Sequence, residues 1–524
     1  MIMNTIKRVI TTAYDIFPIF NRPMTVCAAF SCGAVYYMYR HGNISVSILL
    51  LFLIIAVVFC AISRNKKIIV ISVLFLAVCA SAVNELMLIG DLETLDGRTL
   101  TADFVAVEDA DIGEKVTRVT AYCTGSDEIP ENTKFTLHYF FGKDIKCGDR
   151  FNATVKLTKL ADDKYKTNSL GNSVYMNCQV KTFNTEYEKQ PFFAALGGVR
   201  NYIKETVENN FSSEDSALLI ALNTGDRSFL SDDFYGKVLN CGVSHIMVVS
   251  GLHISIIIGS VFMLLEKFFY NRYLKAVLSL LLIFLISALC GFTLSVLRAG
   301  CMFVFSAVSP VFLRRNDSFN SLGSAVVLLV FINPLCVLSV AFWLSVLSTA
   351  AVVWLAPFYC DIITEKLKLQ NKIAVSIVSV VTVSVTAMIF TAPISFTVFG
   401  YVSLFSPFAF LLLTYPVTYA LILNSVGLLL SAVRGLSFLS EPAFFSAGIF
   451  AKYIRFVINN LGQIGSACVD ADVGVFTVFV FLIFALISGM YLYKYYKKLL
   501  KRKMVGEVYA SAGNNRKRVK ERAQ

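Results

Sequence analysis

The chain has 524 residues, of which 56% are hydrophobic and only 16% are charged. A soluble globular protein carries about 25% charged residues, so the composition excludes a soluble enzyme as the main interpretation. The net charge is +12, and residues 494–522 alone contribute +9, which predicts contact with an anionic membrane surface or a polyanion. With four scattered histidines and no Cys-x-x-Cys pair, the sequence predicts no metal centre and no cofactor.

Three apolar stretches open the chain, at residues 24–39, 44–63 and 68–89. Each approaches the roughly 17–25 residues that a membrane-spanning helix needs. The turn at 64–67 is basic, so the positive-inside rule places it in the cytoplasm. We therefore expect residues 1–90 to form N-terminal transmembrane helices, with the amino terminus in the cytoplasm and the third helix ending outside.

Residues 91–190 differ in composition, with 13 basic and 17 acidic residues and a net charge of −4. Short runs such as 116–122 and 151–157 alternate between apolar and polar residues, and turn residues separate them. This pattern is typical of a small antiparallel β domain, which we expect to be an extracellular barrel of about five strands. Three cysteines fall in this domain, and whether two of them form a disulfide depends on the redox compartment, so the sequence leaves the pairing open. They are Cys123, Cys147 and Cys178.

Residues 191–493 predict a second membrane region. An amphipathic surface helix is expected first, at 194–211, because apolar residues recur there at helical spacing. Six apolar stretches follow, and the charged turns after the first, third and fifth are expected to be cytoplasmic. The stretches are 244–265, 274–291, 293–313, 319–332, 336–357 and 373–399.

The carboxyl-terminal part carries three further elements and a tail. Pro416 interrupts the apolar run 404–433, which predicts two short helices forming a membrane hairpin. Residues 441–468 predict an interfacial amphipathic helix, and 473–493 predict the last span. Residues 494–524 are expected to form a basic cytoplasmic tail that binds membrane lipids. The fold class is thus a polytopic α-helical membrane protein, with about ten transmembrane helices, a membrane hairpin and an extracellular β-barrel.

Several polar residues lie inside or beside the predicted spans. His245, Ser250 and His253 occupy one stretch, and the two histidines fall about 80° apart on a helix, so they could line a polar interior or bond to backbone carbonyls. Arg298 lies inside another span beside Ala299 and Gly300, and we expect its side chain to point inward, towards an anion or an acidic partner. Asp226 and Arg227 follow a glycine turn and are expected either to pair or to cap that turn.

The order of these segments resembles the competence domain of the ComEC family of DNA-uptake channels. The resemblance is carried by Leu-Asn-Thr-Gly-Asp-Arg at 222–227, by Gly-Val-Ser-His at 242–245 running to Ser-Gly-Leu-His at 250–253, by Gly-Phe at 291–292 leading to Leu-Arg-Ala at 297–299, by Ala-Phe-Trp-Leu-Ser at 341–345 and by Ala-Pro-Ile at 392–394 leading to Phe-Gly at 399–400. It implies a channel for single-stranded DNA during natural transformation, whose path Asp226, Arg227, His245, Ser250, Gly251, His253 and Arg298 would line or hold in shape. The layout of the β domain also resembles the family's OB-like barrel.

The resemblance departs from the family at two points. Many family members continue into a metallo-β-lactamase-like nuclease domain with an HxHxDH signature, and no histidine follows His253 here, so we expect a separate nuclease. Trp343 stands where the family usually has glutamine, which leaves the role of that helix open. Partners that the resemblance implies are a DNA receptor, a cytoplasmic helicase and a second copy of the chain.

Two other classes of function compete with the channel. An intramembrane hydrolase could use Ser250 as nucleophile with His253 or His245 as base, although the sequence identifies no orienting group and no oxyanion site. A small-molecule transporter would be expected to show internal repeats, and we find none. The sequence therefore favours the channel and predicts no catalytic residues for it.

Overall fold

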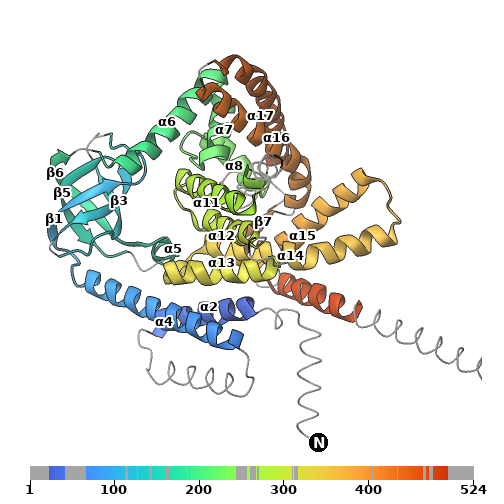
Figure 1. Ribbon diagram of the computed structural model, residues 1–524, viewed down its shortest axis with the longest axis horizontal. Helices are drawn as coiled ribbons and strands as arrows, with labels where there is room; N and C mark the ends of the chain where they lie inside the picture. The colour runs from blue at the N-terminus through green and yellow to red at the C-terminus, as the bar shows by residue number, and fades with distance from the viewer. Residues whose placement is uncertain are drawn as a thin grey trace, which may run out of the picture.

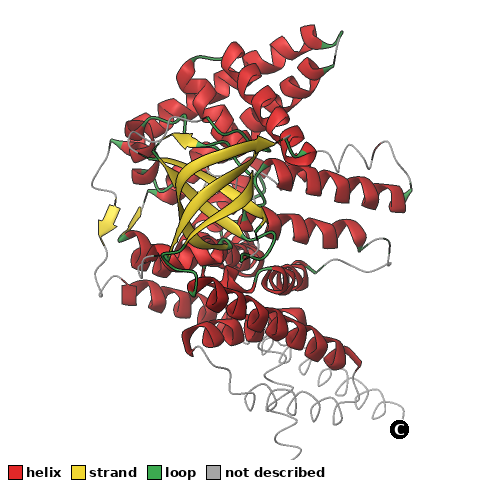
Figure 2. Ribbon diagram, turned by 90° about the vertical axis from the view of Figure 1, so that its left-hand side faces the viewer, coloured by secondary structure: helices red, strands yellow, loops and turns green. Residues whose placement is uncertain are grey.

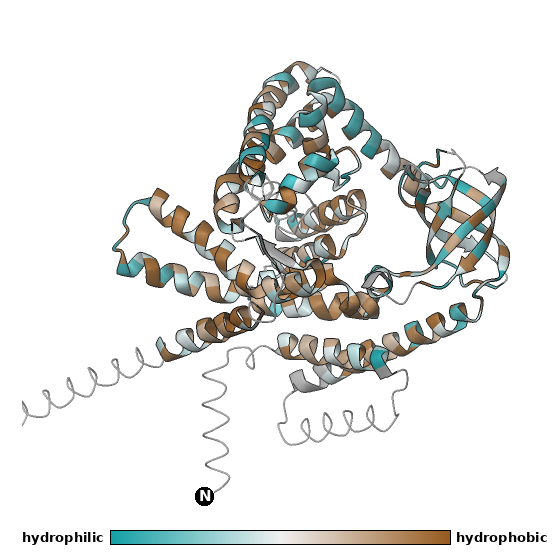
Figure 3. Ribbon diagram, turned by 180° about the vertical axis from the view of Figure 1, so that it is seen from behind, coloured by the Kyte–Doolittle hydropathy of each residue, from teal (hydrophilic) through white to brown (hydrophobic). Residues whose placement is uncertain are grey.

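The computed structural model describes residues 23–41, 66–112, 116–126, 128–140, 144–160, 164–187, 189–243, 257–259, 267, 271–309, 311, 317–403, 405–433, 435–463, 468–470 and 476–493. Helices dominate this part of the chain, and a small β-barrel stands to one side of them (Figure 1). The barrel strands alternate between polar and hydrophobic residues, whereas the helices between Arg272 and Phe399 are hydrophobic along most of their length (Figure 3).

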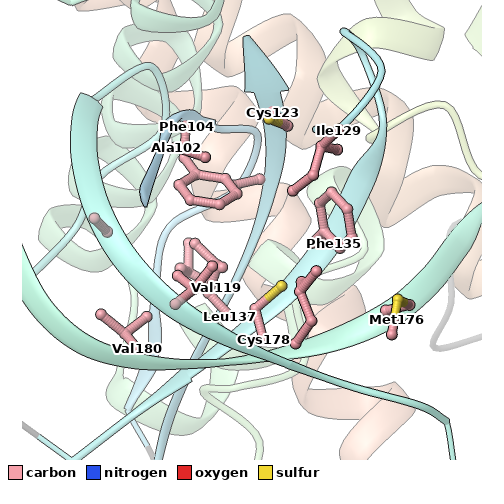
Figure 4. Close-up of a cluster of buried hydrophobic side chains, with 14 of the residues drawn as sticks. Ala102, Phe104, Val119, Cys123, Ile129, Phe135, Leu137, Met176, Cys178 and Val180 are labelled. Atoms are coloured by element: carbon pink, nitrogen blue, oxygen red, sulfur yellow. The ribbon is translucent and has the colours of Figure 1, made fainter. Parts of the chain in front are cut away.

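The barrel is built from five strands that close on themselves. The strand order is β1-β5-β6-β4-β3, a β1–β3 pairing completes the ring, and the short β2 adds to the β3 edge (Figure 2). Alternate residues point into a core that includes Phe104, Phe135, Leu137 and Cys178 (Figure 4). The strands are β1 (Thr99–Ala106), β2 (Asp111–Ile112), β3 (Thr117–Gly125), β4 (Lys134–Tyr139), β5 (Arg150–Thr158) and β6 (Val174–Tyr187). A barrel of about five strands is thus confirmed.

The expectation of a fully antiparallel domain is wrong at one pair. Strands β4 and β6 run parallel, with Thr136 opposite Asn177, while the other barrel pairs are antiparallel. Helix α5 (Lys164–Gly171) lies between β5 and β6 along the chain. Side-chain alternation predicts that a segment is a strand but does not say which neighbour it pairs with, so this closure could not be read from the pattern.

Five helices are long and apolar enough to cross a membrane, judged by length and composition within the described residues. They are Ser72–Glu93, Val340–Lys366, Lys372–Phe399, Ser406–Ala432 and Phe476–Tyr493. Three shorter apolar helices lie between Tyr273 and Ile332. The expected spans at 44–63 and 244–265 fall largely or wholly outside the described residues, so the count of about ten spans stays a prediction.

Helices precede the barrel and follow it along the chain, and the two sets pack against each other. The amino-terminal pair α2 (Pro23–His41) and α4 (Lys66–Glu93) packs against α13 (Ser318–Ile332). After the barrel come α6 (Pro191–Asn210), α7 (Ser213–Thr224) and α8 (Asp232–Asn240), and then the apolar helices α11 (Arg272–Leu289), α12 (Leu294–Val308), α13 (Ser318–Ile332), α14 (Val340–Lys366) and α15 (Lys372–Phe399), with the short 3-10 helix η1 (Pro334–Leu338) before α14.

The predicted break at Pro416 is wrong. Helix α16 (Ser406–Ala432) runs unbroken through Pro416, and the chain turns back only at the 3-10 helix η2 (Ser437–Leu439) into α17 (Ser440–Gly462). A proline removes one helical hydrogen bond, which apolar helices tolerate where neighbouring helices cover the site. Strands β7 (Tyr401–Ser403) and β8 (Cys468–Asp470) pair with each other, so the two ends of the α16–α17 hairpin meet.

Candidate functional site

Arg298 is a buried cation in the apolar helix layer. It lies on α12, and only 6% of the residue is exposed. The neighbouring Gly300 lets α11 approach, because a Cβ atom built on it would lie 2.9 Å from the Cγ2 atom of Ile283. The expectation that small residues let the helices pack closely around Arg298 is therefore confirmed at Gly300.

The partners of Arg298 are neutral. Its Nε atom donates to the Ser345 hydroxyl at 2.7 Å, and its Nη1 atom contacts the Met302 sulfur at 3.4 Å. No carboxylate pairs with Arg298 among the described residues. A guanidinium carries five N–H donors and its charge is costly to bury alone, so this site is suited to an anion.

Ser345 brings a second sequence motif to Arg298. It belongs to the Ala-Phe-Trp-Leu-Ser segment on α14, 47 residues further along the chain. In the same segment, Trp343 donates its indole N–H to the Val337 carbonyl at 2.7 Å, so it holds η1 and does not reach the arginine. The sequence does not assign Ser345 to the site, because a serine inside an apolar helix shows no preference for one partner until its neighbours are known.

Asp226 acts within its own loop, whereas Arg227 reaches α8. Asp226 is exposed and accepts hydrogen bonds from the backbone N–H and the hydroxyl of Ser228, at 3.0 and 2.7 Å. Arg227 donates to the Tyr235 hydroxyl at 2.8 Å and lies over its ring. The local turn is the outcome found for Asp226, whereas Arg227 bonds to a side chain of α8, and no contact of either residue with Arg298 is found among the described residues.

His245, Ser250, Gly251 and His253 lie outside the described residues. Their place in a DNA path, and the alternative hydrolase that would use Ser250, stay predictions. The described chain turns just before them at Gly242, which adopts a φ of +69°. The Gly242 carbonyl accepts a hydrogen bond from the Ser406 hydroxyl at 3.2 Å, which ties this turn to α16. No group of three His, Cys, Asp or Glu residues that could hold a metal ion occurs in the described ranges.

A second arginine, partly buried, pairs with a buried carboxylate. Arg455 of α17 donates to the buried Asp215 carboxylate of α7 at 2.6 Å and also pairs with the exposed Glu214. The Ser212 hydroxyl donates to the other oxygen of Asp215 at 2.7 Å. The sequence predicted only an interfacial helix around Arg455 and could not show this pair, because the carboxylate partner is 240 residues away.

The barrel carries a basic and aromatic outer face on β3 and β4. Arg118 stands opposite His138, and Tyr122 stands opposite Lys134. Burial lowers the pKa of Lys134, and it lowers the pKa of His138 below its usual value, so the His138 ring is neutral at pH 7. No acidic residue lies on these two strands, although the domain as a whole is acidic.

The three cysteines of the barrel domain are free thiols in the structure. Cys123 and Cys178 are part of the barrel core. Cys147 lies outside that core and donates to the carbonyls of Val107 and Phe193, at 3.0 and 3.4 Å. Burial raises the pKa of Cys147 to about 11, so the reactive thiolate is scarce at neutral pH.

Comparison with known proteins identifies the family. The model of the competence protein family matches residues 222–495, which is just over half of the chain. The chain belongs to the competence protein family. The matched range includes Arg298, Ser345 and the segment 244–256, whereas the barrel lies outside it. The family resemblance read from the sequence is thus confirmed.

Two curated proteins are similar to parts of the chain. ComE operon protein 3 of Bacillus subtilis is 28% identical over 173 residues, which is 33% of this chain and 22% of that protein. Recombination protein 2 of Haemophilus influenzae is 32% identical over 135 residues, which is 24% of this chain and 17% of that protein. The similar segments therefore cover about a fifth of the length of these relatives. No solved structure matches the chain.

Proposed function

We propose that this chain is an integral membrane channel that passes single-stranded DNA across the cytoplasmic membrane during natural transformation. Membership of the competence protein family and the five apolar helices support a membrane role in DNA uptake. The observation that carries the proposal is Arg298, a buried guanidinium whose partners in the described chain are all neutral. A phosphate of the moving strand would supply the missing negative charge for the time it passes.

The barrel is proposed to be OB-like and to meet the strand before it enters the membrane. Taken in chain order without β2, its strands are arranged 1-2-3-5-4 and close through the first, which is a Greek-key barrel of five strands. In OB-folds the outer face of the second and third strands binds oligonucleotides. These strands are β3 and β4 here, and their outer face carries the exposed Arg118, a side chain suited to a phosphate. Lys134 and Tyr122 on the same face are half-buried, and the Tyr122 ring packs against the ring of Phe193.

The proposed topology places residues 91–190 outside and both termini in the cytoplasm. The sequence assigns the turns after α11 and after α13 to the outside, and residues at both places bond to the barrel domain or to the helix that follows it. Arg200, which follows the barrel, binds the carboxyl-terminal carbonyls of α11, and Asn333 donates to the Gly171 carbonyl of α5 at 3.0 Å. The basic turns and tail, which would face acidic lipid on the inner side, support the same orientation.

Other proteins would complete the pathway. We propose a surface DNA receptor, a separate nuclease that removes one strand and a cytoplasmic helicase that draws the other strand inward, with a second copy of the chain as a further partner. The chain's own part in this scheme is binding and conduction, for which no cofactor is proposed.

The test compares two charge-removing substitutions in a transformable host whose own family member has been deleted. Arg298→Gln should lower the entry of labelled DNA into the nuclease-protected pool by about tenfold or more, because the buried cation that meets the phosphates is gone. Lys452→Gln removes the same charge from the exposed face of α17 and should leave entry unchanged. Normal entry in Arg298→Gln, at wild-type membrane abundance, would contradict the proposal.

A further inference from the structure

Helix α6 contacts three regions of the molecule that are far apart in the chain. Its 20 residues, about 30 Å long, run from the barrel past the end of α11 to the α16–α17 hairpin (Figure 1). The family match begins after this helix, at residue 222, and the sequence predicted only an amphipathic surface helix here, with no candidate site residue on it.

The first turns of α6 are locked to the barrel by close backbone packing. Gly148 of the barrel adopts a φ of +89°, and a Cβ atom built on it would lie 2.4 Å from the backbone nitrogen of Ala194. On the helix side, a Cβ atom on Gly197 would lie 3.1 Å from the Cys147 Cβ atom. A side chain has no room at Gly148 and would be tight at Gly197, so the barrel and the start of α6 pack closely as one unit.

Arg200 joins this unit to α11. Its Nε and Nη2 atoms donate to the carbonyls of Leu289 and Ala288, at 3.0 and 3.3 Å, and its Nη1 atom donates to the Val107 carbonyl of the barrel at 3.4 Å. The last carbonyls of a helix have no partner within the helix, and a cation there is favourable. One guanidinium therefore binds both the barrel and the last turn of α11.

The last turns of α6 reach the α16–α17 hairpin. The Tyr202 hydroxyl donates to the Leu428 carbonyl at 2.9 Å and shares a hydrogen bond with the Ser431 hydroxyl. Just past the helix, the Phe211 ring packs edge-on against the Phe444 ring, with centroids 5.7 Å apart. Each end of α6 is thus anchored, and Arg200 lies between the two anchors.

We infer that α6 is a strut that fixes the barrel at one position relative to α11 and α12, and that Arg200 is the positioning residue of this junction. The consequence of this arrangement rests on the proposed function. If single-stranded DNA binds the barrel face, the fixed barrel delivers it at a defined place to the helix pair that carries Arg298. Arg200 itself touches no DNA in this scheme. Its loss should spare the capture of DNA and impair the entry of the strand.

The position of the barrel can be measured without any DNA. Spin labels would be placed in the full chain at Thr99 of β1 and at Leu281 of α11, both exposed, through a chemistry that avoids the 13 native cysteines. We expect a narrow distance distribution in the wild type and a broadened one in Arg200→Ala. Arg200→Lys retains a positive charge and an N–H donor but loses the several N–H groups of the guanidinium that bind two regions at once, so the width of its distance distribution should be intermediate. Lys204→Ala, one turn further along α6, should match the wild type, because Lys204 only lies over the Phe229 ring.

The same variants would then be assayed for DNA cross-linked to the protein at the cell surface and for nuclease-protected DNA. Arg200→Ala should keep surface cross-linking and membrane abundance while entry falls about tenfold. An unchanged distance distribution in both Arg200 variants would overturn the inference, as would loss of abundance in both, since Arg200 would then be needed for the fold itself. A wild-type chain that admits no DNA while Arg200→Ala still broadens the distances would contradict the proposed function and support the strut.

Discussion

Two arginines on different helices, Arg298 buried and Arg455 partly buried, show how differently the same side chain is used in this protein. Arg455 on α17 is neutralised by Asp215, whose other oxygen is occupied by Ser212, so the charges are balanced inside the structure. Within the described part of the chain, Arg298 on α12 has a serine hydroxyl and a methionine sulfur as partners instead of a carboxylate. A neutralised arginine holds two helices together, whereas one that is left without a counter-charge is available to an anion that arrives from outside.

The largest effect is expected at the neutralised arginine. Asp215→Asn would leave Arg455 partly buried beside the exposed Glu214 alone, and breaking a buried ion pair costs about 3–5 kcal/mol. We expect the free energy of unfolding to fall by about 3 kcal/mol, with lower membrane abundance and faster proteolysis. Glu214→Gln is the matched control, because exposed ion pairs contribute about 1 kcal/mol or less. Equal stability of the two variants would break the comparison.

A smaller effect is expected at the barrel face. Arg118 is exposed on β3, and Arg118→Glu places a negative charge where the DNA backbone is proposed to lie. Binding of single-stranded DNA to the full chain in lipid nanodiscs should weaken by about tenfold. The slope of log affinity against log salt concentration should become shallower by about the amount that one phosphate contact contributes. Lys181→Glu on β6 makes the same charge change away from these two strands and should affect binding less. Equal losses at both positions would show that the barrel attracts DNA by its overall charge.

At Arg298 itself, we expect a small change in stability although the effect on transport is large. Arg298→Gln removes a buried charge without leaving a carboxylate unpaired, so the free energy of unfolding should change by about 1 kcal/mol or less. Thermal unfolding in detergent, run beside Asp215→Asn, measures the contrast directly. If Arg298→Gln unfolds as readily as Asp215→Asn, both arginines are structural and the distinction between them fails.

The smallest effect is expected from the basic tail. Truncation after Lys503 removes charges that the sequence assigns to lipid binding, each contributing about 1 kcal/mol near an anionic surface. DNA uptake should remain measurable, because six basic residues from Lys494 to Lys503 are retained. Complete loss of uptake at normal membrane abundance would place the tail in the translocation path.

Much of the fold followed from local patterns. Alternation at 116–122 and 151–157 predicted barrel strands, and apolar runs predicted helices where α13, α14 and α15 are found. The failures occurred where distant segments decide the outcome. The parallel pairing of β4 with β6 depends on barrel closure, and the unbroken α16 depends on neighbours that tolerate Pro416.

The candidate site divides in the same way. Arg298 could be found from the sequence, because a charge inside an apolar helix near small residues is costly and must point inward. Its partner Ser345, the ion pair of Arg455 with Asp215 and the junction at Arg200 could not, since each joins residues that are 47 to 240 positions apart. Asp226 was marked by its charge, and the structure shows it serving its own turn.

The central claim is that the phosphates of the moving strand pass Arg298. The most direct measurement places a photoreactive side chain at Met302, whose sulfur lies 3.4 Å from the Arg298 Nη1 atom, and illuminates cells during DNA uptake. A second strain carries the same group at Arg118 on the barrel. We expect cross-links to single-stranded DNA at both positions, and loss of the cross-link at Met302 when Arg298→Gln is added. DNA that enters the cell and cross-links at Arg118 but never at Met302 would contradict the claim.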